Sequence, residues 1–234
     1  MRLLAVLCLV IYANTLVNEY AVDDGMVITG NKFTTQGFKG IKDILTKDSF
    51  LGSMDQNVLP GGRYRPLSIL TFAIEWEFFG DSANKKGNPF VSHLVNVLLY
   101  IACVLLVFWV LRRYLLRKYP DVAFGSALLF AVHPVHIEAV GNLKGRDELM
   151  ALLFMFGAIW LLFDYVERGS TNQLKLVGGL ATYFMALLSK ENPVTFVVIL
   201  PLMLYFFSSA SQKSIVQLGL ALLAVTVFYI AVRV

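Results

Sequence analysis

The chain has 234 residues, of which 57% are hydrophobic and only 15% are charged, whereas soluble globular domains are nearer half apolar and a quarter charged. Together with a mean hydropathy of +0.67, this composition excludes an ordinary soluble protein and predicts an all-α membrane protein. The net charge of +4 fits the excess of Lys and Arg in cytoplasmic loops, and because no basic run is interleaved with aromatic residues, we expect no nucleic-acid partner.

The first apolar run covers residues 3–17 and follows Arg2. A helix needs about 20 apolar residues to cross the hydrocarbon layer, so this run is short enough to be the core of a signal peptide. No convincing cleavage site with small residues follows it, however. We therefore interpret it as an anchored first span, with a signal peptide as the alternative.

Residues 18–89 are polar and mixed, and they predict a long loop outside the membrane. Within this loop, residues 67–79 are apolar but include Glu75 and Glu77. An apolar segment that carries charges suits a helix lying in the membrane interface better than a helix crossing the bilayer. We therefore expect interfacial helices in this loop.

Six further apolar runs follow, and with the first they predict about seven transmembrane helices. Brief connections between them favour antiparallel hairpins. The predicted runs cover residues 90–111, 122–140, 149–166, 174–188, 193–207 and 215–232. Cys8 and Cys103 lie within apolar runs, and we interpret them as small buried hydrophobes rather than a disulfide or a metal pair.

Lys and Arg in the short loops predict the orientation, because short cytoplasmic loops carry an excess of these residues. The loops on one side contain Arg2, Arg112, Arg113, Arg117, Lys118, Arg168, Lys175 and Lys213, whereas the short loops on the other side contain only Lys144, Arg146 and Lys190. We therefore expect the N-terminus inside and the 18–89 loop outside.

Polar clusters would meet at the outer edge of this bundle, where ionisable groups are costly and usually functional. The first is Asp23-Asp24. A carboxylate there can accept a proton from an attacking hydroxyl, and its neighbour can share a cation. The alternative is a solvated pair that caps a helix at the start of the loop.

The second cluster runs from His133 to Glu138, at the outer end of an apolar segment. Pro134 removes a backbone donor and kinks the helix, which frees carbonyls that only a polar or wet cavity would satisfy. His133, His136 and Glu138 offer enough donors to ligate a divalent metal, but their spacing is not that of HExxH. We prefer a hydrogen-bonded polar pocket, with a metal site as the alternative.

Two charged turns complete the set. In Gly145-Arg146-Asp147-Glu148 the planar guanidinium of Arg146 suits phosphoryl oxygens, although acids at a helix start also cap the helix well. Lys190 and Glu191 form either an ordinary turn or a functional pair. Arg65, in the outer loop, adds a further cation to the same side.

The motifs resemble a known family, the transmembrane-and-tetratricopeptide-repeat O-mannosyltransferases of the GT-C class of polyprenyl-phosphate-dependent glycosyltransferases. The resemblance covers residues from about 20 to 195. In chain order it rests on Asp23-Asp24, Tyr64-Arg65-Pro66-Leu67, His133-Pro134-Val135-His136-Ile137-Glu138-Ala139-Val140, Gly145-Arg146-Asp147 and Lys190-Glu191. The His-Pro-x-His-x-Glu-Ala-Val block followed by Gly-Arg is its most specific part.

The resemblance implies an inverting hexosyltransferase, in this family a mannosyltransferase. Its partners would be a polyprenyl-phosphate-linked sugar donor, a protein or glycan acceptor and the lipid bilayer. Asp23, with Asp24 beside it, would act as the base or orient the acceptor. The donor phosphate would be held by Arg146, Arg65 and Lys190, and the pocket would include His133, His136, Glu138, Asp147 and Glu191.

The resemblance also implies where the enzyme works, namely in a bacterial inner membrane facing the periplasm or in the endoplasmic reticulum membrane facing the lumen. Residues 1–234 would form a GT-C-like N-terminal membrane module, and we find no tetratricopeptide repeats in them. Because the chain stops close to an apolar run, we expect a fragment of a longer protein.

Two other functions stay open at this stage. A transporter or flippase would favour charges near the middle of the bilayer and symmetric halves, whereas here the charges cluster at one edge. A non-catalytic membrane anchor is the third possibility, and it would leave the polar clusters far apart in space.

Overall fold

The computed structural model describes all residues except 22, 54–62, 82–85, 168, 170–171 and 234. Parts of the predicted outer loop, and Arg168 of the inside loops, therefore lie outside the described residues. In the described part, every regular element is a helix, and the only extended pairings are isolated bridges. The prediction of an all-α protein is confirmed.

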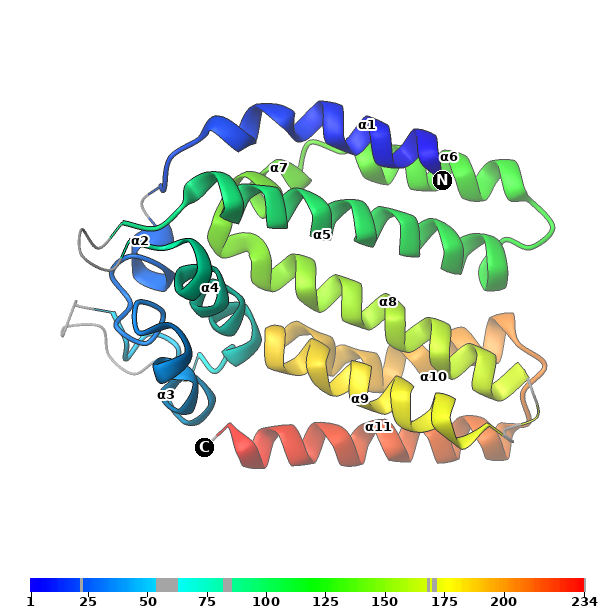
Figure 1. Ribbon diagram of the computed structural model, residues 1–234. Coiled ribbons are helices and arrows are strands. Elements are labelled where there is room, and N and C mark those ends of the chain that lie inside the picture. Colours follow the sequence, from blue (N-terminus) through cyan, green and yellow to red (C-terminus); the bar gives the residue numbers. More distant parts are fainter. Residues whose placement is uncertain (22, 54–62, 82–85, 168, 170–171, 234) are drawn as a thin grey trace.

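Seven apolar helices lie along roughly the same direction in the molecule (Figure 1). These are α1 (Arg2–Tyr12), α5 (Pro89–Val110), α6 (Pro120–Val132), α8 (Arg146–Glu167), α9 (Gln173–Ser189), α10 (Phe196–Phe207) and α11 (Gln212–Val232). Helices α5, α8 and α11 lie in the spans Pro89–Leu115, Leu143–Glu167 and Gln212–Val232, which are long and apolar enough to cross a membrane, and the others are shorter apolar helices. The chain is thus a membrane protein.

Proline and Asn residues start several of these helices. Pro66, Pro89 and Pro120 occupy the first turns of α4, α5 and α6, where a missing N–H leaves no helical hydrogen bond unmade. The side chain of Asn88 accepts a hydrogen bond from the N–H of Val91 at 3.2 Å, which caps α5.

The helices pack around two apolar clusters. One lies among α1, α5 and α6 and includes Ala123, Ala127 and Ala131, all fully buried. Their four-residue spacing forms a stripe of small side chains that lets neighbouring helices approach closely. The other cluster lies among α8, α9, α10 and α11. Helices α5 and α8 pack against each other and join the two halves.

Short helices of the outer loop gather at one end of the bundle: α2 (Asp24–Val27), α3 (Ile41–Thr46) and α4 (Pro66–Phe79) (Figure 1). Helix α4 matches the predicted apolar segment 67–79. It packs Phe72 and Trp76 against Phe33 and Ile44 of the same loop, so a third, smaller core holds these helices in place.

The structure divides the predicted span 122–140 in two. Helix α6 ends at Val132, and a separate short helix, α7, covers His136–Gly141. The cause is Pro134, because its ring and missing N–H prevent the helix from continuing. The polar cluster of this segment therefore lies on a break between helices.

Candidate functional site

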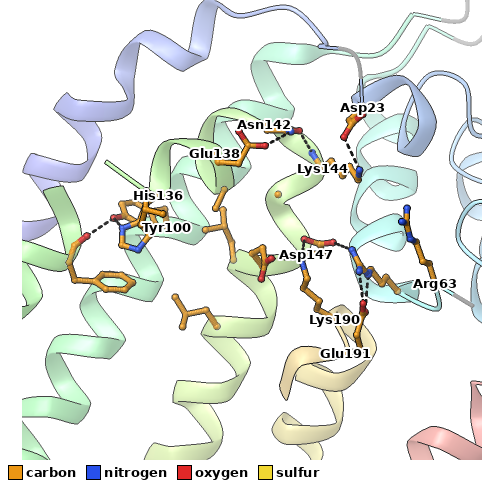
Figure 2. Close-up of a pocket in the computed structure, with 18 residues that line it drawn as sticks. Asp23, Arg63, Tyr100, His136, Glu138, Asn142, Lys144, Asp147, Lys190 and Glu191 are labelled. Atoms are coloured by element: carbon orange, nitrogen blue, oxygen red, sulfur yellow. Dashed lines mark hydrogen bonds and ion pairs between the residues drawn. The ribbon is translucent and has the colours of Figure 1, made fainter. Parts of the chain in front are cut away.

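A cavity of about 730 Å³ opens at the end of the bundle where the outer-loop helices gather. Its walls come from the start of α2, the segment before α4, the α6–α7 break, the turn into α8 and the connection after α9. Seven predicted site residues line it: Asp23, Arg65, His136, Glu138, Asp147, Lys190 and Glu191 (Figure 2). Asp24, His133 and Arg146 do not.

The α6–α7 break creates one wall of the cavity. Pro134 has no N–H to give to the carbonyl of Phe130, four residues earlier. The hydroxyl of Tyr100, on α5, lies 3.1 Å from that carbonyl oxygen and 3.0 Å from the carbonyl oxygen of Ala131. The buried Tyr100 thus supplies the polar partner that the freed carbonyls need in an apolar bundle.

Tyr100 also orients His136. The Nδ1 atom of His136 lies 3.0 Å from the Tyr100 hydroxyl oxygen. Because the single hydroxyl proton is directed to a carbonyl, which cannot donate, the matching arrangement has His136 Nδ1–H donating to Tyr100. The imidazole of His136 is thereby held at the cavity wall.

In the turn from α7 into α8, the backbone at Gly145 packs closely against the backbone of α7. The Asn142 side chain accepts a hydrogen bond from the N–H of Lys144 at 3.1 Å. A Cβ atom on Gly145 would lie 2.6 Å from the carbonyl oxygen of Ala139, so only glycine fits there. This tight turn places Lys144 and Asp147 at the cavity.

The two adjacent aspartates have separate surroundings. Asp24 is 1% exposed, and its carboxylate accepts hydrogen bonds from the N–H groups of Ala21 at 2.9 Å and Lys144 at 3.1 Å. It therefore fastens the first loop to the turn before α8. Asp23 faces the cavity, where its carboxylate pairs with the Lys144 ammonium at 2.8 Å (Figure 2).

Arg65 bridges two carboxylates across the cavity. Its guanidinium donates to Glu191 through Nε at 3.1 Å and through a terminal nitrogen at 2.7 Å, and it donates to Asp147 at 2.5 Å. Burial by itself would lower the pKa of Arg65, but the hydrogen bonds and charges of Glu191 and Asp147 outweigh it and raise that pKa. Arg65 is fully charged at any physiological pH.

The same bridge acts on Glu191. Burial alone would raise the pKa of this carboxyl, but the hydrogen bonds and charge of Arg65 prevail and lower it. Lys190, the preceding residue, lies 3.6 Å from Asp147 and also pairs with Glu148. Both Glu191 and Lys190 are thus charged parts of one network.

The cavity holds nearly balanced charge. The described lining residues include four cations, Arg63, Arg65, Lys144 and Lys190, and five carboxylates, Asp23, Glu138, Asp147, Glu148 and Glu191. A phosphate entering this cavity would compete with carboxylates for Arg65, Lys144 and Lys190, which are already paired. The side chains most easily released are those with one partner, such as Lys144.

Arg146 lies behind the cavity wall and is fully buried. It pairs with Glu75 and donates to Asn96 Oδ1 at 2.8 Å, Thr71 Oγ1 at 3.0 Å and the Ser92 carbonyl at 2.8 Å. Its guanidinium also stacks on Phe72, 3.9 Å from the ring centroid. These contacts tie α4, α5 and α8 together and leave Arg146 no face toward the cavity.

His133, His136 and Glu138 do not converge. His133 Nδ1 accepts a hydrogen bond from the N–H of Val135 at 3.2 Å, and Glu138 accepts one from Asn142 at 3.0 Å. In the part of the chain that the structure describes, no three His, Cys, Asp or Glu side chains are grouped as metal ligands. The geometry favours the polar pocket over the metal site.

Sequence reasoning missed Lys144 and Tyr100. Lys144 was counted only as a cation of a short loop, and Tyr100 was treated as part of the apolar run 90–111. A signal for Tyr100 existed, because a carbonyl freed by Pro134 within a membrane segment requires a donor from a neighbouring helix.

Comparisons with known proteins come from sequence. The family model described as dolichyl-phosphate-mannose-protein mannosyltransferase matches residues 85–233. Protein O-mannosyl-transferase TMTC1 of Homo sapiens is 30% identical over 212 residues, or 87% of this chain and 23% of the human protein. Protein O-mannosyl-transferase Tmtc1 of Drosophila melanogaster is 33% identical over 189 residues, or 81% of this chain and 21% of the fly protein.

These matches confirm the resemblance that the motifs indicated. The chain spans less than a quarter of the length of these two relatives. No solved structure matches it significantly.

Proposed function

The chain belongs to the dolichyl-phosphate-mannose-protein mannosyltransferase family, and we propose that it forms the membrane part of an inverting glycosyltransferase. The enzyme transfers a sugar, mannose by analogy with its named relatives, from a polyprenyl-phosphate carrier to a hydroxyl of a protein acceptor. The reaction takes place in the cavity at the outer-loop end of the bundle, on the extracytoplasmic side of the membrane.

The observation that carries this proposal is the Asp23–Lys144 pair at the cavity. Sugar transfer with inversion needs a base at the acceptor oxygen and positive charge at the departing phosphate. Asp23 is the only cavity carboxylate among the described residues that is paired with Lys144, and it is partly open to solvent. It can therefore exchange partners when substrates bind.

In the proposed step the acceptor oxygen attacks the anomeric carbon, and the bond from that carbon to the phosphate oxygen breaks. The acceptor proton passes to the Asp23 carboxylate, and the lipid phosphate leaves with the bonding electron pair. Lys144, drawn from Asp23 to the phosphate, neutralises the growing charge and frees the base at the same time. Arg63, Arg65 and Lys190 also line the cavity and add further cations for the phosphate.

The predicted phosphate ligands divide into two groups under this proposal. Arg65 and Lys190 line the cavity and keep that role, with Lys144 as an addition. The buried Arg146 instead positions the α8 turn from behind. In the proposed complex the cavity-lining imidazole of His136 accepts a hydrogen bond from a sugar or acceptor hydroxyl.

The first prediction tests Asp23 as the base. We expect Asp23→Asn, in the intact protein, to reduce sugar transfer to an acceptor peptide by about 10²–10⁴-fold, as removal of a general base does. Transfer would be measured in proteoliposomes with a radiolabelled mannosyl-phosphoryl-polyprenol donor.

Asp43→Asn is the matched control, because Asp43 of α3 makes the same kind of single ion pair, with Lys47 just after that helix, away from the cavity. It should leave transfer unchanged. If Asp23→Asn transferred sugar as fast as the wild-type protein, Asp23 could not be the base.

A further inference from the structure

A second cavity, of about 450 Å³, lies at the opposite end of the bundle. It opens between the end of α5, the connection to α6 and the ends of α8 and α10. Helix α8 has 22 residues and thus spans about 33 Å between this region and the turn at the first cavity (Figure 1). The second cavity is therefore too distant to hold any part of the reacting sugar phosphate.

An unusual backbone turn forms its wall. Helix α5 ends in a π-helical turn over Leu111–Leu115, in which the N–H of Leu116 donates to the Leu111 carbonyl at 2.7 Å. Such turns are rare and frequently occur at functional sites. Tyr114 of this turn is buried and forms the floor under Arg117, whose guanidinium lies 5.7 Å from the ring centroid.

The charges at this cavity favour an anion. Arg117 pairs with Glu167, which leaves that pair neutral. Lys118 also lines the cavity, and within the described part of the chain its ammonium has no hydrogen bond or ion pair. The cavity thus carries one uncompensated positive charge, with a guanidinium beside it that can share an anion with Lys118.

The rim of the cavity is aromatic and open. Tyr119 is 62% exposed, Phe206 70% and Phe207 44%, and all three line the cavity. Aromatic side chains beside cations at the end of a membrane helix bundle are typical of the lipid headgroup level. Below this level the exposed apolar faces of the helices meet acyl chains.

We propose that this second cavity binds the headgroup of an anionic phospholipid, with the lipid phosphate at Lys118 and Arg117 and the glycerol and upper acyl chains against Tyr119, Phe206 and Phe207. Basic pockets between transmembrane helices bind anionic headgroups in this manner. A lipid is favoured over free phosphate because the cationic group and the exposed aromatic rim belong to one opening at the membrane edge.

The test measures lipid binding by the intact protein in detergent, by native mass spectrometry with added phosphatidylglycerol. Removing one cation near a headgroup should weaken binding about fivefold, so we expect this loss for Lys118→Ala and near-normal binding for Lys118→Arg. Arg112→Ala is the matched control, because Arg112 is an exposed cation on the same π-helical turn but does not line the cavity.

Two further arms separate the alternatives. Phosphatidylcholine should bind more weakly than phosphatidylglycerol, and inorganic phosphate at the same concentration should not displace the lipid. Unchanged binding by Lys118→Ala, or an equal loss in Arg112→Ala, would overturn the proposal by showing that any attraction is spread over the surface. Displacement by inorganic phosphate would overturn it in favour of a free-anion site.

Discussion

Arg146 and Asp147 are neighbours in sequence, yet one is a buried cation behind the cavity and the other a carboxylate within it. The guanidinium of Arg146 finds partners on α4 and α5, while Asp147 reaches Arg65. Successive residues of a helix point about 100° apart, so a single turn can serve both the core and the site.

The second prediction concerns the role of Arg146. Arg146→Met should destabilise the protein by about 3–5 kcal/mol, because it leaves the Glu75 carboxylate, whose side chain is only 13% exposed, without its cation. Arg146→Met combined with Glu75→Gln should recover a substantial part of that loss, since no unpaired charge then remains. The measurement is the apparent unfolding temperature of the purified protein in detergent.

Arg112→Met serves as the control, because it removes an exposed cation of the same type. A stable Arg146→Met variant that had lost donor binding alone would return Arg146 to the role of phosphate ligand that its sequence position predicted.

The sequence identified the charged residues of the cavity better than their individual roles. It predicted Asp23 and Asp24 as a pair because they are adjacent acids, but their different roles depend on the contacts made at Ala21 and Asp24. There Asp24 folds back to accept the N–H of Ala21, and this points Asp23 to Lys144. Asp24 also accepts the N–H of Lys144, 120 residues away in the chain, and no local pattern predicts such a contact.

At the scale of helices, the prolines and apolar runs predicted which segments are helical better than they predicted where each helix ends. Prolines at residues 66, 89 and 120 fix helix starts and the apolar runs follow them. The predicted span 122–140 was too long because its hydropathy continues through Val135 and Ile137, which are exposed beyond the break at Pro134. Apolar content alone does not reveal where a helix stops.

One ion-pair network joins elements that the sequence could not pair. Arg65, at the cap of α4, holds Glu191 between α9 and α10 and Asp147 at the start of α8. The separation in sequence reaches 126 residues. This network attaches the outer-loop helices to the second half of the bundle.

The third prediction is the pH dependence of that attachment. The pKa of Glu191 is lower in the folded protein than in the unfolded chain. Its contribution to stability is therefore complete above the ordinary glutamate pKa, near 4.3, and is lost as the pH falls through the lower folded value. We expect the unfolding temperature to fall as the pH drops below about 5, and to fall less in Glu191→Gln.

Glu148→Gln provides the comparison, since Glu148 is more exposed and, in the described part of the chain, pairs only with Lys190. Its acid sensitivity should resemble that of the wild-type protein. An equal acid loss in wild type and Glu191→Gln would show that the Arg65–Glu191 contact does not contribute.

Across the whole molecule, the two ends of the bundle differ in charge. The end with the outer-loop helices holds the balanced cavity of acids and bases, whereas the opposite end presents Arg112, Arg113, Lys118 and Lys213 as exposed cations. This asymmetry was predictable from loop composition, because it depends on counting charges between apolar runs rather than on side-chain geometry.

The final prediction is the orientation that this asymmetry implies. In intact cells, a membrane-impermeant maleimide should label Lys42→Cys, on α3 at the cavity end, but should label Lys213→Cys, at the start of α11, only after permeabilisation. Both positions are exposed and lie at opposite ends (Figure 1). The native Cys8 and Cys103 are buried, so the unmodified protein supplies a low-background control. Labelling of Lys213→Cys in intact cells, with Lys42→Cys protected, would invert the topology and place the proposed transfer site in the cytoplasm, where the extracytoplasmic reaction could not occur.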